Sequence, residues 1–179
     1  MVFESLPLAG LTLIAPTQFQ DLRGVFVKTF HELLWAKAGI KFHAAEEFYS
    51  TSHRGVIRGM HFQSPPFSHE KVVTCIQGAV LDVVLDLRKG SRTYGKATGV
   101  ELSAANHHVL YIPRGFAHGF LALQECSIIY YKVSSVHEPA ADNGIRWDSF
   151  TFDWGISSPT ISPRDSKFPR LHDFDSPFA

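Results

Sequence analysis

The chain has 179 residues, 45% of them hydrophobic, which fits one compact domain (residues 1–179) better than two. Lys plus Arg and Asp plus Glu each number 17, so no net field would draw the whole chain onto nucleic acid or an anionic membrane. No stretch approaches the ~18 apolar residues of a membrane span, and the N-terminus has no basic region. We therefore expect a cytoplasmic protein that binds neither nucleic acid nor membrane.

One short segment near the N-terminus predicts a helix. It runs from His31 to Ala38 (HELLWAKA) and stops at Gly39, a frequent helix terminator. Elsewhere, short apolar runs broken by Gly and Pro predict strands. These runs are VFVKTF (25–30), VIRGMHF (56–62), HHVLYIP (107–113), FLAL (120–123) and SIIYYKV (127–133).

The segment AVLDVVLDLR (79–88) has the clearest strand pattern, because apolar residues alternate with Asp82 and Asp86 at a period of two. KVVTCI (71–76) precedes it across Gly78, so we interpret residues 71–88 as a hairpin. Cys75 and Cys126 lie in apolar stretches and are expected to be buried free thiols. From about residue 157 the chain is rich in Ser, Pro and Asp, which predicts an irregular C-terminal tail on an all-β sandwich, jelly roll or barrel.

A Pro-x-Gly-x-x-His spacing at 113–118 is similar to the second conserved motif of the cupin superfamily, jelly-roll barrels that commonly hold a metal. Metal cupins carry a Glu ligand seven residues before a turn Gly, and here Lys71 stands seven residues before Gly78. A protonated lysine has no lone pair and repels a divalent cation, so this replacement argues against a metal. The segment His61-Phe62-Gln63 also lacks the His-x-His pair of those proteins.

Taken together, the motifs resemble the dTDP-4-dehydrorhamnose 3,5-epimerase family over most of the chain. The longest matching segments are VIRGMHFQ (56–63), DVVLDLRKGSRTYG (82–95) and IPRGFAHGF (112–120). Shorter ones are DLRG (21–24), YK (131–132), GIRW (144–147) and SPRD (162–165), with Lys71 between them. The resemblance implies a cupin-like jelly-roll β-barrel and a cofactor-free epimerase of a nucleotide-linked 4-keto sugar, usually a homodimer that serves deoxysugar and polysaccharide synthesis.

The resemblance also implies a set of catalytic residues. His61 would be the base that removes a proton next to the C4 ketone, and Asp165 would hold its other ring nitrogen. Lys71 would place its charge at the C4 oxygen and offset the developing enolate, and Tyr131 would be the general acid on the opposite face. No metal or other cofactor is needed for these steps.

The implied substrate-binding residues surround the same site. Arg58 and Arg23 would hold the diphosphate, because a guanidinium fork suits two phosphate oxygens. His118 and Gln63 would line the sugar pocket.

The sequence departs from the family pattern at positions that would touch the nucleotide. Lys28 stands where the family commonly has an acidic residue, and Glu46 replaces a neutral amide. Cytosine offers an N3 acceptor and an amino donor where thymine offers an N–H donor and a carbonyl acceptor. Lys28 and Glu46 therefore suggest a CDP-linked sugar, although both also fit solvated charges on a barrel rim.

A further departure concerns the sugar. His137 stands where the family usually has a second tyrosine, six residues after Tyr131. Since that tyrosine borders the sugar, its replacement suggests a single-site epimerase acting at C5 or C3.

Two alternatives from other classes stay open at this stage. One is a metal-dependent cupin oxygenase or isomerase whose ligands would be His61, His69 and His118, which Lys71 disfavours. The other is a non-catalytic sugar-binding barrel, which would not need the base, its aspartate and the acid together.

Overall fold

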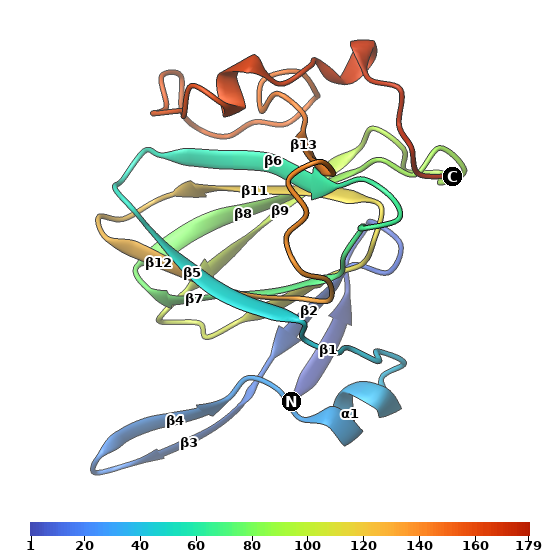
Figure 1. Cartoon of the computed structure of the whole chain (residues 1–179). Helices are drawn as coiled ribbons and strands as arrows, with labels where there is room; N and C mark the ends of the chain where they lie inside the picture. The colour runs from blue at the N-terminus through green and yellow to red at the C-terminus, as the bar shows by residue number, and fades with distance from the viewer.

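The computed structural model describes residues 1–179 and is built mainly from two facing antiparallel sheets (Figure 1). The six-stranded sheet has the order β1 (Val2–Ser5), β2 (Thr12–Ala15), β10 (Val109–Ile112), β7 (Lys71–Gln77), β12 (Ser127–Val133), β5 (Glu46–Ser52). The five-stranded sheet has the order β13 (Asp142–Gly144), β6 (Ile57–Gln63), β11 (Phe116–Ala122), β8 (Ala79–Asp86), β9 (Ala97–Ser103). The sheets are not joined into one ladder, so the jelly roll is an open barrel, and the predicted all-β cupin-like fold is confirmed.

Each strand of the barrel sends alternate residues to opposite faces, and β8 shows how both faces are used. Val80 and Val84 point inward, into a core that both sheets share. Val83 and Leu85 point outward and are equally buried, because the C-terminal tail covers them. The predicted strand is confirmed, and its polar face, with Asp82 and Asp86, is buried as well.

The irregular tail expected from about residue 157 lies over the outer face of the five-stranded sheet (Figure 1). It contains only two short 3-10 helices, η1 (Asp165–Lys167) and η2 (Leu171–Asp173). Its apolar side chains pack with those of the sheet, and Phe62 contacts both Phe174 and Phe178 edge to face. This packing places Asp165 against β6, where it contacts Gly59 and His61, two residues that are distant from it in sequence.

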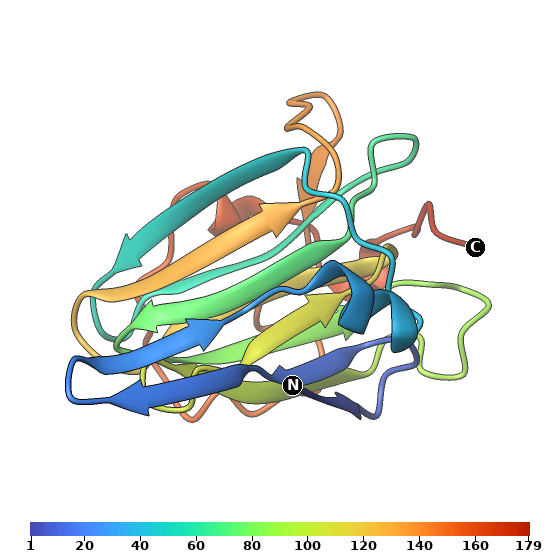
Figure 2. The same ribbon diagram turned by 90° about the horizontal axis from the view of Figure 1, so that it is seen from below.

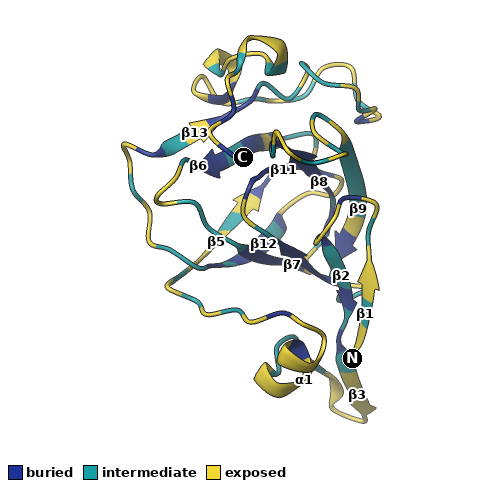
Figure 3. Ribbon diagram, turned by 90° about the vertical axis from the view of Figure 1, so that its right-hand side faces the viewer, coloured by how far each residue is buried: buried dark blue, intermediate teal, exposed yellow.

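The opposite face, on the six-stranded sheet, is covered by the N-terminal segments (Figure 2). The predicted helix is confirmed as α1 (Glu32–Lys37), whose Trp35 is fully buried against Ile14, Val72 and Tyr111. With six residues in α1, no helix is long and apolar enough to cross a membrane. Strands β3 (Thr17–Asp21) and β4 (Gly24–Lys28) form a separate hairpin that projects from the barrel and is largely exposed (Figure 3).

Two expectations from the sequence were wrong. Residues 71–88 do not form a hairpin, because β7 pairs with β10 and β12 while β8 pairs with β11 and β9. Gly78, at φ +74°, carries the chain from one sheet to the other, and a Cβ there would lie 2.5 Å from Ser127 Oγ. Cys75 is a buried free thiol as expected, but Cys126 is exposed in the connection between β11 and β12.

Candidate active site

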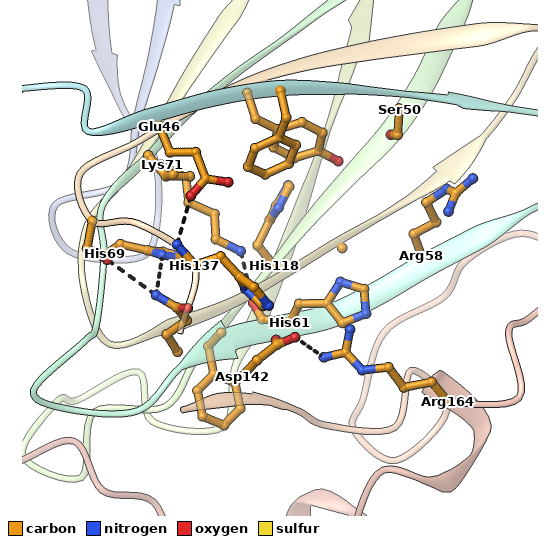
Figure 4. Close-up of a pocket in the computed structure, with 17 residues that line it drawn as sticks. Glu46, Ser50, Arg58, His61, His69, Lys71, His118, His137, Asp142 and Arg164 are labelled. Atoms are coloured by element: carbon orange, nitrogen blue, oxygen red, sulfur yellow. Dashed lines mark hydrogen bonds and ion pairs between the residues drawn. The ribbon is translucent and has the colours of Figure 1, made fainter. Parts of the chain in front are cut away.

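A cavity of about 360 Å³ opens between the edge strand β5 and strand β6, in the size range of small-molecule sites (Figure 4). Most residues expected at the site line it: Glu46, Arg58, His61, Gln63, Lys71, His118, Tyr131 and His137. Ser50 and Arg58 lie at one end and Glu46, His69 and His137 at the other, with His61 and His118 between them (Figure 4). The fold therefore gathers residues from β5, β6, β7, β11 and β12 into one pocket.

His61 on β6 forms a pair with Asp165 of the tail. Its Nε2 lies 2.9 Å from Asp165 Oδ1, so the carboxylate accepts the Nε2 proton and Nδ1 carries the lone pair. Burial works to raise the pKa of Asp165, but the hydrogen bonds from His61 and the Gly59 N–H hold that pKa below its usual value. The carboxylate is thus ionised, and the imidazole is oriented and ready to accept a proton.

Gly59 makes this pairing possible because β6 bends where it meets β11. The register between these strands shifts between His118 and Phe120, and Gly59 has φ +146°. A Cβ at Gly59 would lie 2.5 Å from the Gly119 Cα, so only glycine fits. The freed Gly59 N–H donates to Asp165 Oδ2 at 3.1 Å and fixes the second carboxylate oxygen.

Lys71 is the buried cation of the pocket. Its Nζ donates to the His61 carbonyl oxygen at 3.1 Å. Burial lowers the pKa of Lys71 to about 8, while the charges of Asp142 and Asp82 act to raise it. The ammonium is therefore still the main form near neutral pH. It reaches from β7 across to the His61 backbone on β6.

Tyr131 on β12 lies across the pocket from β6. Its ring stacks on Phe48, with centroids 4.8 Å apart, and meets the His118 ring edge to face at 6.0 Å. Burial, aided by the negative charge of Asp82, raises the pKa of Tyr131 well above its usual value. The phenol therefore keeps its proton at every pH where the protein is expected to work, so it can donate but is not a resting base.

Asp82 is a site residue that the sequence analysis did not identify. It is fully buried on β8, and the His118 Nε2 lies 3.0 and 2.9 Å from its two oxygens. Burial lowers the pKa of His118, although Asp82 opposes this shift. A neutral His118 would then present its Nδ1 lone pair to the pocket. The available signal was an Asp in the middle of an apolar strand, on the face opposite Val83 and Leu85.

Two arginines bring positive charge to the pocket. Arg58 is held by Ser52 Oγ, which accepts from Nε at 3.0 Å, and by the Thr51 carbonyl, which accepts from Nη2 at 3.1 Å. Arg164, from the tail, was not predicted and also lines the pocket, where it pairs with Asp142 of β13 at 2.7 Å. Arg58 has no carboxylate partner and therefore keeps its charge available to an anion.

At the end of the pocket away from Arg58, Glu46 and Gln63 bind the backbone of the chain between β12 and β13, which carries His137. Glu46 Oε2 accepts the His137 backbone N–H at 2.7 Å. Gln63 Oε1 accepts the Glu138 N–H at 2.6 Å, and its Nε2 contacts the Phe67 carbonyl at 2.9 Å. The side chain of His137 lines the cavity between them.

Three expected residues do not line the pocket of their own chain: Asp165 lies behind His61, while Arg23 and Lys28 lie far from the cavity. Arg23 sits in the turn of the β3–β4 hairpin, is 90% exposed and pairs with Asp21 at 2.6 Å. Lys28 ends β4 and is exposed. The hairpin that carries both points away from the barrel (Figure 1).

The histidines are placed as hydrogen-bonding partners rather than as a cluster. His61, His69 and His118 contact Asp165, Gln63 and Asp82 respectively. No group of three His, Cys, Asp or Glu side chains is arranged to hold a metal ion.

Comparison with known proteins identifies the family. Residues 5–173 match the family described as dTDP-4-dehydrorhamnose 3,5-epimerase. The chain is 39% identical to a dTDP-4-dehydrorhamnose 3,5-epimerase of Sinorhizobium fredii, covering 96% of this chain and 90% of that protein. It is 38% identical to a dTDP-4-dehydrorhamnose 3-epimerase of Streptomyces niveus, covering 92% and 81% respectively.

Solved structures agree with these matches. The crystal structure of a dTDP-6-deoxy-D-glucose-3,5-epimerase from Legionella pneumophila, in complex with dTDP-4-keto-L-rhamnose, superposes with a TM-score of 0.92. It is 31% identical, and the match covers 97% of this chain and 94% of that one. Sequence motifs, fold and pocket lead to the same conclusion. The chain belongs to the dTDP-4-dehydrorhamnose 3,5-epimerase family.

Proposed function

We propose that the protein epimerises a nucleotide-diphospho-4-keto-6-deoxy sugar at C3, C5 or both. The observation that carries the proposal is a single pocket holding an oriented base, a buried ammonium and a protonated phenol, which are His61, Lys71 and Tyr131. A hydrogen next to a ketone is removable when a base is placed against it and the enolate oxygen is stabilised. These are the two requirements that the pocket meets.

In the proposed reaction, His61 Nδ1 takes the carbon-bound proton and the bond's electron pair moves into an enolate at the C4 oxygen. Asp165 balances the imidazolium that forms, and Lys71 balances the enolate. Tyr131 then donates its proton to the opposite face of the carbon and the stereocentre inverts. Solvent then removes the extra proton from His61 and returns a proton to the Tyr131 phenolate, which restores the enzyme.

The end of the pocket that carries Arg58, beyond the catalytic base His61, would hold the diphosphate. Arg58 presents a guanidinium without a carboxylate partner there, beside the Ser50 hydroxyl. His118 would accept a hydrogen bond from a sugar hydroxyl through Nδ1, since its Nε2 is bound to Asp82.

Position-resolved deuterium uptake tests this proposal. The enzyme is incubated in deuterium oxide with dTDP-, CDP- and GDP-linked 4-keto-6-deoxy sugars, and C3 and C5 are read separately by NMR. We expect exchange at C3, C5 or both, and none in His61→Asn with the fold intact. Exchange that survives in His61→Asn would place the base elsewhere. The relatives include both 3,5- and 3-epimerases, so the ratio of C3 to C5 exchange also decides whether this is a single-site enzyme.

A CDP-linked substrate was the second candidate from the sequence, but Glu46 lies at the end of the pocket opposite Arg58, where it would border the sugar and not the nucleobase. Titrations with dTDP and CDP decide this point, and a clear preference for dTDP would exclude it.

We further propose that the working unit is a homodimer in which the β3–β4 hairpin of one protomer reaches the pocket of its partner. Support comes from Phe19 and Phe26, apolar rings that are exposed on the hairpin, and from Arg23, whose expected diphosphate contact is not met within its own chain. Exposed aromatic side chains beside an arginine are typical of interfaces.

Subunit mixing tests the dimer directly. Arg23→Ala and His61→Asn are each expected to lower activity strongly. In a mixed dimer, one pocket would have an intact His61 and an intact Arg23 from the other protomer, so activity should return on mixing. Sedimentation shows whether dimers exist, and no recovery from exchanged dimers would mean that Arg23 does not act in the partner's pocket.

A further inference from the structure

The chain between β12 and β13 forms the wall at one end of the pocket, and its backbone is held from two sides. Ser135 and His137 of this segment line the cavity, and Figure 4 shows His137 there. The segment has no ladder partner of its own, since β12 ends at Val133 and β13 begins at Asp142. Backbone hydrogen bonds hold only its two ends, from the Ser134 N–H to the Glu70 carbonyl and from the Ser64 N–H to the Ala141 carbonyl, so side chains must position the residues between them.

Gln63 supplies one set of contacts. Its Nε2 lies 3.2 Å from the Val136 carbonyl and 3.3 Å from Ser135 Oγ, and its Oε1 accepts the Glu138 N–H at 2.6 Å. The same amide nitrogen also contacts the Phe67 carbonyl at 2.9 Å. An amide has only two N–H hydrogens, so its donors are already used by the protein and none is left for a ligand.

Glu46, on β5, supplies the other contact. Its Oε2 accepts the His137 N–H at 2.7 Å, between the two backbone groups that Gln63 holds. The peptide groups on both sides of His137 are thus fixed by side chains from opposite sheets. The imidazole of His137 lies at the same end of the pocket as Lys71 and His69 (Figure 4).

We propose that Gln63 and Glu46 are positioning residues that hold His137 beside the sugar, and that the placement of His137 sets the preference between C3 and C5. This inference rests on the proposed function, because it assumes that the sugar lies next to Lys71. It assigns to Gln63 and Glu46 a role through the backbone, in place of direct contact with the sugar or the base.

The distinguishing substitutions are Glu46→Gln and Glu46→Met. Glutamine keeps an oxygen that can accept the His137 N–H, whereas methionine has a similar length and no such acceptor. We expect Glu46→Gln to keep the wild-type ratio of C3 to C5 exchange. Glu46→Met should shift that ratio in the same direction as His137→Ala. Two results together would overturn the proposal: Glu46→Gln changes the preference between dTDP and CDP, and its ratio of C3 to C5 exchange is the same as that of Glu46→Met. They would mean that Glu46 recognises the nucleobase.

A double-mutant cycle tests Gln63. Gln63→Met should shift the ratio on its own but have little further effect in a His137→Ala background, because both changes act through one imidazole. Independent, additive effects would mean that Gln63 contacts the substrate, which contradicts the proposal.

Amide hydrogen exchange of residues 134–138 gives a readout that needs no activity. Loss of one hydrogen bond should speed exchange roughly five- to tenfold in Glu46→Met and Gln63→Met, with Glu46→Gln close to wild type. Unchanged exchange in the methionine variants would refute the positioning role even if the sugar chemistry is as proposed. The opposite outcome is faster amide exchange in the methionine variants together with a wild-type protein that epimerises none of the sugars. It would mean that the proposed function is wrong and the positioning role is right.

Discussion

His69 provides a test of the electrostatics of the pocket through protein stability. The residue lies just before β7, its Nδ1 is 3.2 Å from the Gln63 amide nitrogen, and its Nε2 is buried without a partner. Burial lowers the pKa of His69 to about 3, and the nearby charge of Lys71 contributes in the same direction. The ring is therefore neutral in the folded protein at any pH near neutrality.

The sign of the effect follows from comparing the two states. In the unfolded chain the pKa of this histidine is 6.5, and in the folded protein it is about 3. Between these values the unfolded chain binds a proton that the native protein does not, so the free energy of unfolding falls as the pH falls. The slope for one proton is ~1.4 kcal/mol per pH unit, which amounts to about 2 kcal/mol between pH 6.5 and pH 5.

Replacing His69 by Gln removes this titration and keeps a neutral polar side chain. Urea unfolding, followed by tryptophan fluorescence at pH 8 and pH 5, gives the free energy of unfolding of both proteins. We expect the stability of His69→Gln relative to wild type to rise by about 2 kcal/mol from pH 8 to pH 5. His172→Gln is the matched control, because that side chain is 67% exposed. If the difference between His69→Gln and wild type is the same at both pH values, the reasoning about a neutral buried ring is wrong.

Three further changes probe the charged groups of the pocket. Asp82→Asn should lower the free energy of unfolding by ~1–2 kcal/mol in urea titrations, because it replaces the carboxylate that accepts the buried hydrogen bond from His118 with a weaker, neutral acceptor. Lys71→Met should reduce the rate of deuterium exchange by about 10²–10³-fold, and in the wild type this rate should fall as the pH rises through about 8, where Lys71 loses its proton. Asp165→Asn should slow exchange by roughly 10³-fold or more, because His61 loses the partner that fixes its tautomer; a rate near wild type would remove Asp165 from the mechanism.

The strands could be predicted because their signals are local, and most pocket residues because the motifs that carry them match the family. An alternation such as that of 79–88 depends only on neighbouring residues, and so does the end of α1 just before Gly39. Gly78 marks a turn equally well whether the next strand pairs with β7 or crosses to the other sheet. That choice depends on which distant strands are available as partners, which no local pattern contains, and the predicted hairpin failed for this reason.

The pairings within the site were out of reach for the same reason. Asp165 is 104 residues from His61 in sequence, and only the family resemblance connected them. Asp82 is 36 residues from His118, and its role appeared only when β8 and β11 were seen side by side. Arg23 matched the family motif, yet its place on a projecting hairpin depends on how the whole N-terminal segment packs.

The charge arrangement around Lys71 explains why an ammonium suits this barrel. Lys71 contacts a neutral carbonyl oxygen and forms no ion pair, while the Asp82 carboxylate is bound to His118 and the Asp142 carboxylate to Arg164. A buried cation without a contacting anion is costly, which is why its pKa is lowered. An enolate forming at a neighbouring oxygen would supply the missing anion, so the ammonium gains more from the transition state than from the neutral ketone. Differential stabilisation of this kind is what lowers a reaction barrier.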